Sequence, residues 1–63
     1  MSKTRKKELV YDLERAARRL YEARANLQVF PDKEAYIDFN SAKDSLIAAA
    51  FALQEYIERI KEA

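Results

Sequence analysis

Phe30-Pro31-Asp32-Lys33-Glu34 is the segment that divides this 63-residue chain into two halves of similar length. Pro31 is the only proline, and its ring disfavours helical geometry in the residue that precedes it. Asp32 and Glu34 follow, and the exposed N–H groups at the start of a helix favour negative charge. The segment therefore predicts the end of one helix and the start of another. Either Pro31 opens the second helix or Asp32 caps it, and the sequence leaves both open.

On both sides of this break, apolar residues recur alternately every four and three residues. This is the heptad pattern (positions a to g) of helices that pack against each other at a shallow angle. Large side chains occupy the a positions: Leu13, Leu20, Leu27, Phe39, Leu46, Leu53 and Ile60. Most d positions are occupied by alanine: Ala16, Ala23, Ala35, Ala42 and Ala49. The remaining d positions are Leu9, Phe30 and Tyr56. Alanine in every second layer lets the two helix axes approach closely.

We expect a single domain over residues 1–63. It begins with a basic arm (1–6), followed by a helix over about 5–28, a turn over about 29–32 and a second helix over about 33–61. A link of only a few residues makes the helices antiparallel. The first half carries eight Lys or Arg against four Asp or Glu, and the second half four against seven, so opposite net charges favour this pairing. The predicted fold is all-α, a two-helix antiparallel hairpin (an αα-hairpin).

The second helix is apolar over more than one stripe. Residues 46–53 read LIAAAFAL, an apolar run of more than two turns, whereas a two-helix hairpin buries only the faces that meet. Leaving Ile47, Phe51 and Ile57 in water would forfeit roughly 1.5–3 kcal/mol for each side chain. Two hairpins that pair into a four-helix bundle solve this problem. We therefore predict a homo-oligomer, most simply a homodimer, with Ile47, Ala50, Phe51 and Ile57 at the interface; an unidentified protein partner is the alternative.

The composition excludes several classes of site. The chain has no cysteine, histidine or glycine, which excludes disulfides, the usual zinc-finger ligand sets and glycine-rich phosphate-binding loops. The hydroxyls of Thr4, Ser41 and Ser45 lack a base to activate them. Carboxylates at 55, 58 and 62 share one helix face and could bind a divalent cation, but charged runs on helices usually face solvent. We expect no enzyme, no catalytic or metal residues and no cofactor.

The strongest charge feature is the basic run Lys3, Arg5, Lys6 and Lys7. Such a run could contact the phosphates of nucleic acid, although the whole chain has a net charge of only +1. No apolar stretch of signal-peptide type follows the run, and no apolar run is long enough for a membrane span. We therefore expect a cytoplasmic protein that acts as a self-associating protein–protein interaction or scaffold module. A nucleic-acid-associated regulator that uses the basic arm is the alternative.

The spacing of small and large residues resembles that of the YaaL-like family of short uncharacterised bacterial proteins, which have paired alanine-rich helices. The resemblance covers about residues 8–62. It is carried by Ala16, Leu20, Ala23, Leu27, Phe30, Asp32, Ile37-Asp38, Ala42, Ala49-Ala50, Leu53 and Lys61. It implies a helical hairpin and no activity.

Overall fold

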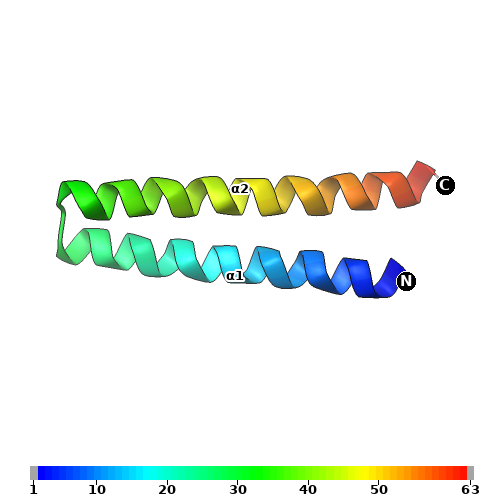
Figure 1. Cartoon of the computed structure of the whole chain (residues 1–63), viewed down its shortest axis with the longest axis horizontal. Helices are drawn as coiled ribbons and strands as arrows, with labels where there is room; N and C mark the ends of the chain where they lie inside the picture. Colours follow the sequence, from blue (N-terminus) through cyan, green and yellow to red (C-terminus); the bar gives the residue numbers. More distant parts are fainter. Residues whose placement is uncertain (1, 63) are drawn as a thin grey trace.

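The computed structural model shows two long helices that pack side by side as an antiparallel hairpin (Figure 1). Helix α1 spans Ser2–Val29 and helix α2 spans Lys33–Glu62. The structure describes residues 2–62, and the side chains of residues 4–61. The molecule is a rod of 47 × 16 × 12 Å, with the turn at one end and the start of α1 beside the end of α2 at the other (Figure 1). The predicted all-α hairpin is confirmed.

Helix α1 begins three residues before its predicted start, so the basic run lies on the helix and not on an extended arm. Neither helix contains glycine or proline, and both are rich in residues with high helix propensity, such as Ala, Leu, Glu, Lys and Arg. Because no residue near Ser2 opposes helical geometry, the helix continues through the basic run. Residues 2–6 of the predicted 1–6 arm are therefore the first turns of α1, and Met1 lies outside the described residues.

The link between the helices consists of Phe30, Pro31 and Asp32. The N–H of Phe30 donates to the carbonyl of Asn26 (2.8 Å), and the N–H of Asp32 donates to the carbonyl of Phe30 (2.8 Å) across Pro31. The Asp32 Oδ1 then accepts a hydrogen bond from the N–H of Ala35 (2.8 Å). This is the geometry of an N-cap, which supplies a partner for one of the free N–H groups in the first turn. Of the two alternatives that the sequence left open, Asp32 is the cap of α2.

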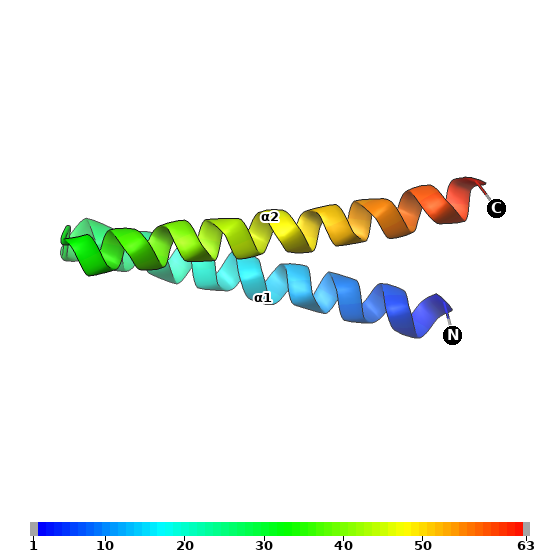
Figure 2. The same ribbon diagram turned by 45° about the horizontal axis from the view of Figure 1, so that its top comes forward.

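The contact between the helices runs along the d positions. Ala42 has no exposed surface (0%), and Leu9, Ala23 and Ala35 are also buried. The large a residues are only half-buried: Leu13, Leu20, Leu27, Phe39, Leu46 and Leu53. Figure 2 shows that the helices cross at a shallow angle, as the heptad spacing predicted. Small residues therefore form the line of closest approach, and the large residues lie to one side of it.

Two apolar residues at the predicted a and d positions are not buried between the helices. Ile60 is 52% exposed and Phe30 is 61% exposed. Ile60 lies in the last turns of α2, opposite the first turns of α1, and the first buried apolar residue of α1 is Leu9. Phe30 lies past the end of α1, in the link. The prediction that Ile60 is buried between the helices is wrong, and the side chains that the structure describes in the first turns of α1, at residues 4–8, are all polar.

Candidate functional site

The hairpin has two unlike flat faces. Because the helices run in opposite directions, the same rotation about each axis carries both rows of a residues to one side of the d line. The next position round on that side, e, carries further apolar residues of α2, including Ala50 and Ile57. We call this side the apolar face, defined by Leu13, Leu20, Leu46, Ala50, Leu53 and Ile57. Each of these residues is half-buried or exposed.

The opposite side, which we call the polar face, is organised by Arg19 of α1. Its Nη2 lies 3.5 Å from the Asp38 Oδ1 and donates a hydrogen bond to the Ser41 Oγ (3.4 Å). Its Nη1 donates to the Ser45 Oγ (3.4 Å). The sequence predicted no contact between Arg19 and these two serines, because no spacing rule links residues on different helices. Three polar side chains of α2 on this face thus have a partner on α1, whereas the apolar face has no cover.

The predicted interface residues are all exposed in the hairpin. Ile47 is 45% exposed, Phe51 59% and Ile57 38%, and Ala50 is exposed as well. Ala50 and Ile57 lie on the apolar face. At 100° per residue, Ile47 lies at its edge, and Phe51 lies on the side of α2 that is turned away from α1. The structure thus places Ala50 and Ile57 on the apolar face and Ile47 at its edge, whereas Phe51 lies outside it.

The basic residues at the start of α1 do not form a single stripe. Arg5, Lys6 and Lys7 are consecutive and exposed, so their side chains leave the helix about 100° apart. The Arg5 Nη1 also lies 3.8 Å from the Glu8 Oε2 on the same helix. The side chain of Lys3 lies outside the described residues. The positive charge is therefore spread around α1 and is not gathered on one side that could face the phosphates of a nucleic acid.

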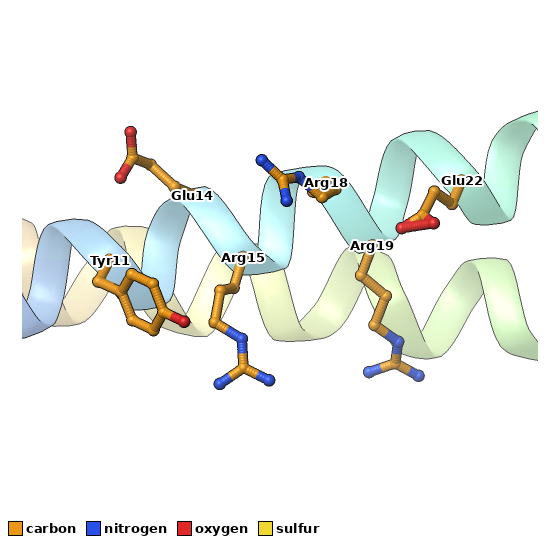
Figure 3. A pocket seen from close by; sticks show the side chains of 6 residues that line it. All are labelled: Tyr11, Glu14, Arg15, Arg18, Arg19 and Glu22. Carbon is orange, nitrogen blue, oxygen red and sulfur yellow. The ribbon is translucent and has the colours of Figure 1, made fainter.

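The outer surface of α1 carries a shallow hollow between arginines (Figure 3). The Arg15 guanidinium lies over the Tyr11 ring, 5.7 Å from its centroid. The guanidinium groups of Arg15 and Arg19 extend to the same side of α1, and Glu14 extends to the other (Figure 3). All lining residues come from one helix: Tyr11, Glu14, Arg15, Arg18, Arg19 and Glu22. Two glutamates flank three arginines here on an open surface, and such a mixture of charges is typical of a solvated helix.

Among the side chains of residues 4–61, no serine or threonine hydroxyl has a base as its hydrogen-bond partner. Ser41 and Ser45 accept hydrogen bonds from Arg19, which is not a base. Within residues 2–62, no group of three or more carboxylates is placed to hold a metal ion. Of the three carboxylates predicted to share a face, Glu55 and Glu58 are exposed, and the side chain at 62 lies outside the described residues. The apolar face is therefore the candidate functional surface.

No protein-family model matches the chain, and neither a curated protein nor a solved structure is similar to it. The resemblance to the YaaL-like family thus stays a prediction. Within residues 2–62, neither helix has an apolar stretch long enough to cross a membrane.

Proposed function

We propose that this chain is a non-catalytic interaction module whose apolar face binds a second copy of itself to form a four-helix bundle. The half-exposed row of large a residues is the observation that carries the proposal. In a four-helix bundle, a helix contacts two neighbours, so it needs apolar residues at a, d and e. Helix α2 has this pattern, with Leu46 and Leu53 at a, alanine at d, and Ala50 and Ile57 at e.

The size of the exposed apolar surface supports a partner. A chain of about 60 residues buries a small share of its surface and has little stability to spare. Each Å² of apolar surface removed from water contributes about 25 cal/mol, so covering the apolar face stabilises the fold directly. A second copy fits this face because it has the same length and the same spacing of large residues. Closed two-fold dimers are also the commonest oligomers of soluble proteins.

The test compares the same substitution at two alanines that lie on different sides of α2. Ala50→Asp places a carboxylate on the apolar face, and Ala48→Asp places the same carboxylate about 200° away, on the polar face. Both alanines are exposed in the hairpin, so neither substitution disturbs the contact between α1 and α2. We expect sedimentation velocity to give a dimer for the wild type and for Ala48→Asp, and a strongly weakened dimer for Ala50→Asp.

A monomeric wild type at micromolar to millimolar concentration would refute the proposal. Equal dimer stability in the two variants would also refute it, because the interface would then lie elsewhere. Loss of helicity in Ala50→Asp alone, seen by circular dichroism, agrees with the proposal, since a dimer and its fold are coupled in a chain this small.

A further inference from the structure

We infer that, in the dimer, α1 of each copy packs against α2 of the other, with both turns at the same end of the bundle. This inference rests on the proposed function and adds the arrangement of the second copy. Two hairpins that meet through their apolar faces have two arrangements with two-fold symmetry. In the same-end arrangement, α1 lies over the second copy's α2. In the opposite-end arrangement, α1 lies over α1 and α2 over α2.

The backbone does not distinguish these arrangements. Neighbouring helices are antiparallel in both, so the helix dipoles favour neither. The heptad spacing is shared by α1 and α2, so layers of apolar side chains form in either case. The choice therefore depends on the charged residues.

The net charges of the two helices favour the same-end arrangement. The half with α1 carries eight basic and four acidic residues, a net of +4, and the half with α2 carries four basic and seven acidic residues, a net of −3. Neighbouring axes in a bundle lie 8–10 Å apart, which is close to the Debye length of about 8 Å at physiological ionic strength. In the same-end arrangement, all four neighbouring pairs join helices of opposite charge. In the opposite-end arrangement, one pair joins two positive helices and another joins two negative ones.

Two charged residues of α1 at the apolar face also favour the same-end arrangement. Lys6 and Arg24 occupy an a and an e position near opposite ends of α1, and both are exposed. The opposite-end arrangement would bring Lys6 of one copy close to Arg24 of the other, twice per dimer. The same-end arrangement keeps Lys6 of both copies at the open end of the bundle and Arg24 of both copies near the turns, so these two positions stay apart. These two like charges are thus separated only in the same-end arrangement.

The distance between the two turns tests the arrangement. The chain has no cysteine, so Gln28→Cys gives a single site for a nitroxide label near the turn. In the same-end arrangement, the two labelled α1 helices are diagonal neighbours, with axes about 14 Å apart for a square of 10 Å sides. In the opposite-end arrangement, the labels lie about 24 residues apart along the rod, or about 36 Å at 1.5 Å per residue. Glu14→Cys is the matched control, because it lies near mid-length and gives a short distance in both arrangements.

Pulsed dipolar spectroscopy on the full chain distinguishes three outcomes. Short distances at both positions support the inference. A short distance at position 14 with a distance above about 35 Å at position 28 overturns the inference and leaves self-association intact. No dipolar coupling at either position, together with a monomeric mass, refutes both the inference and the proposed function.

Discussion

Asp32 is exposed, yet it accepts two hydrogen bonds that hold the turn and the first turn of α2 together. Its side chain accepts the hydrogen bond from the N–H of Ala35, and its carbonyl accepts the hydrogen bond from the N–H of Tyr36 (3.1 Å). The side-chain bond is lost in Asp32→Ala, and loss of an N-cap costs about 1 kcal/mol of stability. We expect urea denaturation to show that decrease. Asp32→Asn keeps the acceptor and should stay within a few tenths of a kcal/mol of the wild type; equal losses in both variants would show that the cap does not stabilise α2.

Arg19 makes three contacts across the polar face, yet we expect it to add little stability. Its ion pair with Asp38 is long and about half exposed on both sides, and such pairs contribute between 0.2 and about 1 kcal/mol. Arg19→Ala should therefore lower the free energy of unfolding by less than about 1 kcal/mol. Chemical denaturation in low and high salt measures this, with a smaller difference at high salt because screening weakens the pair. A loss well above that limit would mean that the serine hydrogen bonds matter more than their lengths indicate.

At the scale of the helices, Ala42 sets the distance between α1 and α2. It has no exposed surface, so a larger side chain at this position has no free space. We expect Ala42→Leu to destabilise the hairpin by about 1–3 kcal/mol through overpacking. Ala48→Leu adds the same side chain on the exposed side of α2 and should change stability by less than about 0.5 kcal/mol. Thermal denaturation of both variants checks the difference, and a stabilised Ala42→Leu would show that the seam contains a void.

The sequence predicted the elements well because the helix signals are local. One proline, the acidic residues after it and an unbroken heptad were enough for two antiparallel helices. Which of Pro31 and Asp32 starts α2 depends on one hydrogen bond, which composition does not reveal. Ile60 was misplaced because the heptad continues to the end of α2, while the described side chains of α1 before Leu9, at residues 4–8, are all polar. The partners of Arg19 lie between 19 and 26 positions further along the chain, and no local sequence pattern predicts contacts at such separations.

At the scale of the whole molecule, the exposed apolar face links folding to concentration. Because a dimer is stabilised by mass action, its melting temperature rises with protein concentration. We expect the melting temperature of the wild type to increase steadily across a hundredfold concentration series, and that of Ala50→Asp to change much less. A wild-type melting temperature that is independent of concentration would show that the single hairpin is the folded unit.

The three partners of Arg19 also oppose sliding of α2 along α1 in one direction. A heptad repeats itself over seven residues, so layers of apolar side chains can form again after a shift of that length. When α2 moves so that residues seven positions later face Arg19, Ser45, Ala48 and Ala52 replace Asp38, Ser41 and Ser45, and the carboxylate and one of the two hydroxyl acceptors are lost. A shift the other way would bring Glu34 and Asp38 to Arg19, and the three-residue link between Val29 and Lys33 opposes that movement. A short link and a weak polar contact thus act together to hold the two helices in one alignment.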